Sequence, residues 1–223
     1  MSQTHGKSPS VLSELGSLAA LGIVFTCMQR PRGVRRRSVV LGAVATVPAS
    51  LAVRPLARAA GSYHPLEVKT AIIGKIAEFI NWPPEANLND PTRPFELVIL
   101  GDTPLGPRLF AYYGTQGVTI AGHRVFPRRA RNVDDIGHAH LLFVGPSYEN
   151  RLQEVLAAIG RMSVLTMGDT EGYASRGLAV NLYLSNDQVR FEISRRALGR
   201  QRLSASYRLL GLARLIEDQQ ARR

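Results

Sequence analysis

The first patterned stretch of the chain, HPLEVKTAIIGKIAEFINW, repeats apolar residues at the spacing of an amphipathic helix. Pro65 stands near its start, where proline is tolerated, and Pro83 and Pro84 follow Trp82 directly. The pattern therefore predicts a helix that runs to Trp82 and is stopped by the two prolines. We expect its buried face to carry Leu66, Ala71, Ile72, Ile76, Phe79 and Ile80.

Further along, short and largely apolar runs alternate with helical patterns, as in chains that build a parallel sheet covered by helices. This order predicts an α/β fold, a three-layer α/β/α arrangement with a mostly parallel sheet. Strands are expected at 95–101, 139–145 and 162–169, helices at 102–114 and 147–160, and one or two more strands, with a turn at Gly122, at 117–129.

The last third changes character. Two runs of alternating residues within 178–194 are joined by Ser185, Asn186 and Asp187, which are turn-forming residues, so we expect an antiparallel hairpin at the sheet edge. A terminal helix is expected after residue 204. The chain is predicted to form a single domain of residues 62–218, followed by a polar tail of residues 219–223. The inward residues of that helix are predicted to be Tyr207, Leu210, Leu212, Ala213 and Ile216.

Residues 1–59 have the features of an export signal rather than of a fold. Three arginines, Arg35 to Arg37, precede an apolar stretch with small residues, and Ala57 and Ala59 form a small-x-small cleavage site. Cleavage near Ala59 is expected, with both the general and the twin-arginine export routes left open. Met28 is a second candidate start. The apolar run is shorter than the 20 or so residues of a membrane span, so we expect none in the mature form.

Charge and cysteine content narrow the possibilities. The net charge is +11, but residues 1–59 hold eight basic residues against one acidic residue, so the exported part carries only a modest surplus. Such a surplus does not indicate nucleic acid as a partner. The single cysteine, Cys27, lies before the expected cleavage site, so the exported product forms no disulfide within itself.

Small and polar residues follow three of the predicted strands. In open α/β sheets ligands bind at the carboxyl ends of strands, so this edge is the candidate crevice for a small ligand. The glycine spacing differs from a dinucleotide fingerprint, and we expect no cofactor. The crevice residues are Gly101, Asp102, Gly145, Ser147, Gly168 and Asp169.

Two signals of catalysis or metal binding have simpler explanations. Ser147 follows a predicted strand, but VGPSY lacks the second glycine of a nucleophile elbow, so we interpret Ser147 as a helix N-cap and predict no catalytic residue. His138 and His140 could share a metal, yet a third ligand is not apparent in the sequence. Solvated histidines beside a turn are the preferred interpretation, and no metal site is predicted.

The NWPP stretch allows two interpretations. Phe79 and Trp82 can pack on the sheet while Pro83 and Pro84 direct the chain onward, which the amphipathic pattern favours. Alternatively Trp82, Pro83 and Pro84 form a protein contact, since tryptophan is enriched at interfaces.

Five sequence blocks together resemble the YfiR family of exported bacterial proteins, in order and in spacing. They are VKTAIIGKIAEFINWPPEA, FELVILGDTPLGPRL, HLLFVG, VLTMGDTEGYASRGLAVNLYLSNDQVRFEIS and LSASYRLLGLARLI, which cover nearly all of residues 66–216.

The resemblance implies a periplasmic, non-enzymatic regulator that restrains an inner-membrane diguanylate cyclase, and so acts in cyclic di-GMP signalling. The alternative is a periplasmic sensor or receptor for a small ligand, serving another membrane signalling protein. A homo-oligomer is left open. Members of the family known for redox control use disulfides, and residues 60–223 contain no cysteine, so this chain lacks that route.

Overall fold

The computed structural model describes residues 64–216. The predicted export signal, Cys27, the cleavage site near Ala59 and the polar tail lie outside these residues, and so do the limits predicted for the domain. Those expectations stay predictions.

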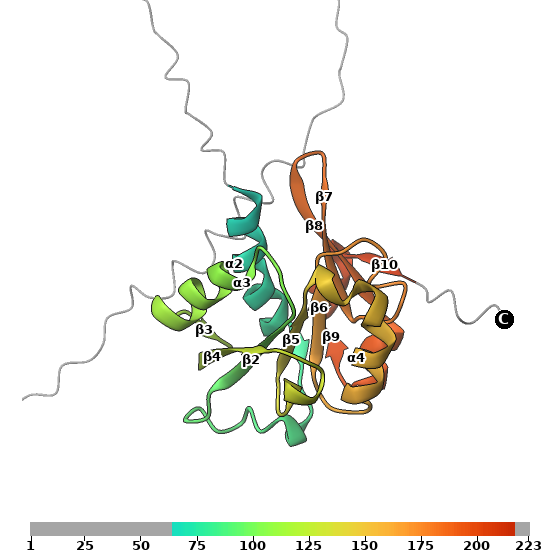
Figure 1. Ribbon diagram of the computed structural model, residues 1–223. Coiled ribbons are helices and arrows are strands. Elements are labelled where there is room, and N and C mark those ends of the chain that lie inside the picture. The colour runs from blue at the N-terminus through green and yellow to red at the C-terminus, as the bar shows by residue number, and fades with distance from the viewer. Residues whose placement is uncertain (1–63, 217–223) are drawn as a thin grey trace, which may run out of the picture. The chain divides into compact units, whose positions relative to one another are not determined.

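Within residues 64–216, eight strands form a mixed and mostly parallel sheet in the order β10-β8-β7-β6-β5-β2-β4-β3 (Figure 1). From β4 through β7 each neighbouring pair is parallel, whereas β3 with β4 and β7 with β8 are antiparallel. The predicted α/β class is confirmed. The strands are β2 Phe95–Leu100, β3 Thr119–Ile120, β4 His123–Ala130, β5 Leu141–Val144, β6 Leu165–Gly168, β7 Val180–Ser185, β8 Gln188–Ser194 and β10 Arg214–Ile216.

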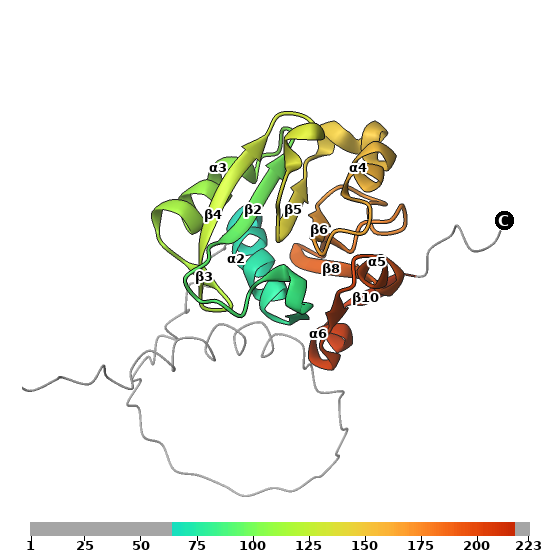
Figure 2. The same ribbon diagram turned by 90° about the horizontal axis from the view of Figure 1, so that it is seen from below.

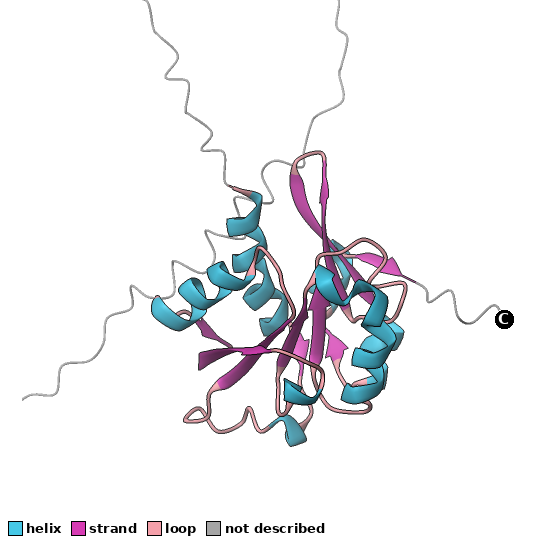
Figure 3. Cartoon of the chain, in the orientation of Figure 1, coloured by secondary structure: helices cyan, strands magenta, loops and turns pink. Residues whose placement is uncertain are grey.

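Helices lie on both sides of this sheet (Figures 1 and 3). A separate two-stranded ladder pairs β1, Ile80–Asn81, with β9, Ser204–Ala205. The helices are α2 Pro65–Glu78, α3 Gly106–Leu109, α4 Leu152–Ile159, α5 Arg195–Arg200 and α6 Tyr207–Leu212, with a π-helical turn at Phe110–Thr115 and 3₁₀ turns at Pro84–Ala86, Asp134–Ile136 and Pro146–Arg151.

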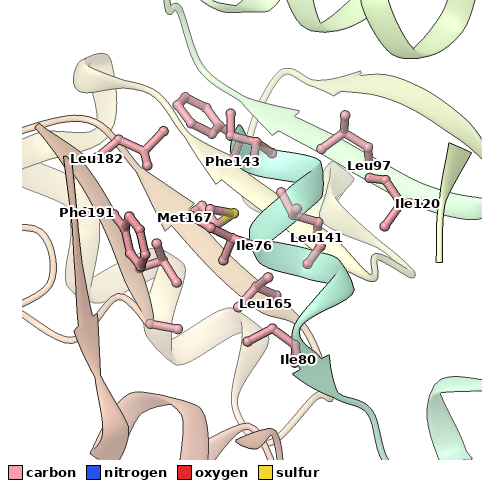
Figure 4. Packing of buried hydrophobic residues seen from close by; sticks show 14 of the residues in the cluster. Ile76, Ile80, Leu97, Ile120, Leu141, Phe143, Leu165, Met167, Leu182 and Phe191 are labelled. Carbon is pink, nitrogen blue, oxygen red and sulfur yellow. The ribbon is translucent and has the colours of Figure 1, made fainter. Parts of the chain in front are cut away.

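The central strands are buried on both faces because successive side chains point to opposite sides of a sheet. In β2, Leu97 and Ile99 belong to one apolar cluster, and Val98 and Leu100 belong to the other. The first cluster packs against α2, and Figure 4 shows Ile76 of this helix among side chains of the sheet. The second cluster includes residues of α4. This two-sided burial explains the continuous apolar runs in the sequence.

Helix α2 ends earlier than the sequence predicts. It stops at Glu78, and Ile80 and Asn81 then pair with β9, so the predicted helix end at Trp82 is wrong. The prolines come after the helix has already ended. Pairing with a strand more than 120 residues away overrides the local helical pattern, which carries no information about that partner.

The predicted hairpin is confirmed, but its place at the edge is wrong. Asn186 and Asp187 both have positive φ, as a two-residue type I′ turn requires, and Ser185 pairs with Gln188. Strand β10 lies outside β8 and runs parallel to it, with Arg214 beside Glu192. At residues 192–194 the backbone of β8 is therefore paired on both sides, and β10 is the edge strand.

The prediction of a long terminal helix is also wrong. Helix α6 ends at Leu212, and the chain then extends into β10. Tyr207 is 93% exposed and Leu212 is 51% exposed, whereas Leu209 is buried. The reason is that the six-residue helix turns Leu209 alone fully inward before the chain joins the edge of the sheet. Helix α5 was not predicted.

A buried tyrosine joins α2 to the π-helical turn. The Tyr113 hydroxyl accepts a hydrogen bond from the backbone N–H of Gly74 at 2.8 Å and donates one to the Thr70 carbonyl at 2.8 Å. A Cβ on Gly74 would lie 2.5 Å from that hydroxyl oxygen, so only glycine allows this approach. Burial raises the pKa of Tyr113 well above its ordinary value, which keeps the phenol protonated as a donor.

Replacing Tyr113 with Phe tests this junction. The change leaves the Gly74 N–H and the Thr70 carbonyl without their buried partner, so the free energy of unfolding should fall by about 1–3 kcal/mol. Denaturant unfolding measures it. The control is Tyr207→Phe, at a 93% exposed site, which should change stability by less than about 0.5 kcal/mol. Equal effects of the two changes would contradict the assignment.

Candidate functional site

The parallel register brings the predicted crevice residues to one edge of the sheet. Leu100 at the end of β2 lies beside Val144 at the end of β5, and Val144 lies beside Gly168 at the end of β6. The residues that follow these three strands are therefore neighbours, as the sequence predicted.

The first two of these strand ends pack directly against each other. The Ser147 hydroxyl accepts a hydrogen bond from the backbone N–H of Asp102 at 2.9 Å. Gly101 has φ +76°, and a Cβ there would lie 2.4 Å from the Ser147 oxygen. Ser147 thus joins two loops and does not cap a helix: the prediction of an N-cap is wrong, since the 3₁₀ turn begins after Gly145 and α4 starts only at Leu152.

Tyrosine 173 fills the space at the third strand end. Its hydroxyl donates to the Gly145 carbonyl at 2.9 Å, and a Cβ on Gly168 would lie 2.5 Å from its ring. A Cβ on Gly145 would lie 2.5 Å from the Asp102 carbonyl oxygen. The glycines at this edge therefore permit close packing of the chain. Ligand binding here stays a prediction.

Asp169 turns toward α2 and forms an ion pair that the sequence did not predict. The Lys69 ammonium lies 3.1 Å from its carboxylate, and each side chain is only 11% exposed. A second pair, between Arg108 and Glu67 at 3.4 Å, lies nearby on α3 and α2 but is more exposed. The nearly buried pair ties the first turns of α2 to the carboxyl end of β6.

Two cavities lie away from the predicted crevice. One of about 200 Å³ opens among Asn87, Arg93, Pro94, Glu96, His138 and His140. The other, of about 430 Å³, is lined by Val133, Asp134, Ile136, Gly137, Ala158 and Met162. The first is at the amino ends of β2 and β5, opposite the edge where the crevice was expected.

His140 is buried, so the expectation of a solvated histidine is wrong for this residue, and backbone groups engage both of its ring nitrogens. Its Nδ1 accepts from the Glu96 N–H at 2.8 Å, and its Nε2 lies 2.9 Å from the Ala86 carbonyl oxygen. Burial is the main reason that the pKa of His140 lies below its ordinary value. Among residues 64–216, three or more side chains suited to a metal nowhere gather. His140 precedes β5 and Ser147 follows it, so they lie at opposite ends of that strand.

Trp82 lies over the same end of the sheet. Its ring meets Phe95 edge-on at 5.7 Å between centroids and His140 at 6.3 Å, and its Nε1–H donates to the Ala77 carbonyl at 3.3 Å. The side chain is half-buried, Pro83 is partly buried, and Pro84 is exposed. The geometry agrees with the packing interpretation for Trp82, and a contact role for Trp82, Pro83 and Pro84 stays a prediction.

Exposed apolar and basic residues meet where α6 passes into β10. We call this set the C-terminal surface: Tyr207, Arg208, Leu212, Arg214 and Leu215, all exposed. Figure 2 shows α5, β10 and α6 together, and the register places Ile216 beside Ser194, the N-cap of α5. Sequence reasoning missed this surface because it assigned Tyr207 and Leu212 to a buried face.

The surplus of positive charge among the described residues lies in the last part of the chain, to which this surface belongs. Residues 188–216 contain seven arginines, no lysine and one acidic residue, Glu192, whereas residues 64–187 contain eleven basic and thirteen acidic residues. Arg214 is paired with the buried Glu192 and lies over the Tyr183 ring at 4.7 Å. The charge is therefore segregated within one chain.

A model of the YfiR/HmsC-like family matches residues 66–214, two thirds of the chain. The chain belongs to this family. Membership confirms the resemblance seen in the sequence. YfiR-like proteins are exported, periplasmic and regulatory rather than catalytic. In general, they regulate diguanylate cyclases.

Solved structures resemble the chain only distantly, and no curated protein matches it. A conserved domain protein from Vibrio cholerae O1 biovar El Tor gives a TM-score of 0.49 at 10% identity, over 69% of this chain and 60% of that chain. The ABC domain in complex with L-Trp from Streptococcus pneumoniae gives 0.47 at 9% identity, over 68% and 60%. The chain thus spans 60% of the length of each, and this similarity is too low to assign a function.

Within residues 64–216, every helix falls short of the length and apolar character that crossing a membrane would require.

Replacing Trp82 with Ala should destabilise the protein. The half-buried ring loses its contacts with Phe95 and His140, so the free energy of unfolding should fall by about 3 kcal/mol, the lower end for aromatic truncation. Pro84→Ala, at an exposed neighbouring site, is the control and should change it by less than about 0.5 kcal/mol. An unshifted melting curve for Trp82→Ala would contradict the packing interpretation.

The Lys69–Asp169 pair predicts a non-additive result. Asp169→Asn leaves the ammonium of Lys69 nearly buried without its counter-charge and should cost about 3 kcal/mol, whereas adding Lys69→Met should recover most of that loss. Lys75→Met is the control, because its pair with Glu78 is more exposed and contributes about 1 kcal/mol or less. Additive losses in the double variant would show that the two charges do not act as a pair.

Proposed function

We propose that this protein restrains an inner-membrane diguanylate cyclase by direct contact with the cyclase's periplasmic part. The single observation that carries the proposal is the C-terminal surface, where an almost fully exposed tyrosine lies among exposed leucines and arginines. Family membership indicates the class of partner. In this proposal the C-terminal surface binds that partner.

The composition of this surface suits a protein contact. Tyrosine and arginine are enriched in interfaces and in their hot spots, and lysine is depleted there. The two cations of this surface, Arg208 and Arg214, are arginines, whose planar guanidinium groups bind carboxylates with two hydrogen bonds, and Arg214 already pairs with Glu192. The surface therefore fits a partner that presents acidic side chains around an apolar centre.

The NWPP stretch is proposed as part of the same contact. Ser206, the N-cap of α6, donates its backbone N–H to the Phe79 carbonyl at 2.9 Å, and β1 pairs with β9 next to it. Trp82, Pro83 and Pro84 thus follow directly on a strand tied to the start of α6. In this proposal the exposed Pro84 and the exposed Tyr207 belong to one continuous contact surface.

The alternative is a sensor of a small ligand for another membrane signalling protein. The predicted crevice, Gly101, Asp102, Gly145, Ser147, Gly168 and Asp169, is its proposed site. Against it, Tyr148 packs against Gly101 and Tyr173 packs against Gly168, so side chains already occupy much of this edge. The cavity beside His140, about 200 Å³, is smaller than the roughly 300 Å³ at which ligand pockets usually begin, whereas the cavity beside Met162, about 430 Å³, reaches that size but lies away from this edge.

Deletion of the gene should raise cellular cyclic di-GMP, and overproduction should lower it, because restraint of a cyclase is lost or increased. Nucleotide levels are measured by mass spectrometry, and affinity capture from the envelope identifies the cyclase. The effect should vanish when that cyclase is also deleted. Unchanged nucleotide levels would favour the ligand sensor.

The surface itself is tested with Tyr207→Ala and Leu212→Ala in the full chain. Both residues are exposed, so the melting temperature should barely change, while binding of the captured cyclase should weaken by about 2 kcal/mol or more for a hot spot. Phe126→Ala is the matched control, since Phe126 is also exposed, at 56%. It lies on β4, near the end of the strand order opposite to β10. Undiminished binding by both variants would place the contact elsewhere.

A further inference from the structure

The segment from Pro83 to Pro94 connects the NWPP stretch to β2, and two buried histidines hold its backbone. His140 contacts the Ala86 carbonyl, and His123 contacts the carbonyls of Leu88 and Arg93. Both histidines are 4% exposed. They come from β4 and from the approach to β5, so the segment is attached on both sides of β2.

Histidine 140 fits this arrangement only when its ring is neutral. Nδ1 must accept the Glu96 N–H, so the single proton lies on Nε2 and is donated to the Ala86 carbonyl. Protonation of Nδ1 would place two hydrogens against each other at 2.8 Å between nitrogens. The hydrogen bond from the Glu96 N–H, which holds the start of β2, would then be lost.

Histidine 123 has the opposite requirement. Its Nδ1 lies 2.9 Å from the Arg93 carbonyl oxygen, and its Nε2 lies 3.0 Å from the Leu88 carbonyl oxygen. A neutral imidazole has one donor, so one of its nitrogens would face a carbonyl oxygen with a lone pair. Only the doubly protonated ring donates to both carbonyls.

We propose that His123 and His140 clamp segment 83–94, and that protonation of His140 opens this clamp. A proton on Nδ1 pushes the ring away from the Glu96 N–H, and the contact of the displaced ring with the Ala86 carbonyl is lost with it. This inference does not depend on a cyclase partner.

The charged groups around the clamp are few. Asp90 and Arg93 lie on the segment beside His123, and Asp90 is an ionised acceptor whose pKa is lowered chiefly by its bond from the Thr92 hydroxyl. His138 lies 4.8 Å from His140 between ring centroids, and its charge and that of His123 both disfavour a second charge on His140. Glu96 faces Arg128 at 3.9 Å.

These surroundings set the direction of the acid response. Because the pKa of His140 is lowered in the fold, mainly by burial, the unfolded or detached state binds more protons below its ordinary value of about 6.5. The attachment is therefore fully present above that pH and is lost as the pH falls. One linked proton changes the opening constant by up to about tenfold per pH unit.

Hydrogen exchange of the full-length protein across pH tests the clamp. The amides of Ala86, Asn87 and Arg93 donate within the segment and report its opening. After correction for the intrinsic rate, their opening constants should rise below about pH 6.5, by up to about tenfold per unit. Opening constants that stay flat across pH would overturn the proposal.

Nitrogen NMR of the histidine rings supplies an independent readout on the unmodified protein. At the pH of greatest protection, His140 should be the neutral Nε2–H tautomer. A charged His140 in a protected segment would overturn the proposal, even if every variant failed to fold.

Variants assign the acid response to His140. His140→Gln keeps a donor and an acceptor but does not titrate, so the acid rise should disappear. His138→Gln is the matched control, since this exposed histidine is adjacent to His140 and should leave the acid rise in place. Loss of the acid rise in His138→Gln alone would place the switch at the wrong histidine.

Discussion

The parallel pairing of β2 with β5 is the constraint on which the other features depend. Both strands are buried on both faces, so each residue of the pair except Glu96 contributes to one apolar cluster or the other. Their carboxyl ends bring Gly101 and Ser147 into contact, and their amino ends bring Glu96 and His140 together. The tightly packed edge and the histidine clamp are thus two ends of one ladder.

Sequence pattern was sufficient for the parts of the fold that are locally regular. The apolar runs, the Asn186–Asp187 turn and the fold class were predicted correctly because period and turn chemistry are local properties. The end of α2 and the short α6 were not. There the outcome depends on β1 and β10, which have two and three residues and pair with strands that the local pattern does not reveal.

For the candidate site, the edge could be predicted but its occupants could not. The order of strands and helices indicated where Gly101, Gly145 and Gly168 would meet, while the tyrosine that fills the edge and the lysine that pairs with Asp169 come from distant segments. The roles of His123 and His140 depend on which backbone carbonyls approach them. Such contacts leave no periodic trace in a sequence.

The contact between Gly74 and Tyr113 also limits how this chain can evolve. A side chain at position 74 needs the space that the phenol ring occupies, and a smaller residue at position 113 leaves the helix backbone without its partner. Each position thus restricts which side chain fits at the other, although 39 residues separate them.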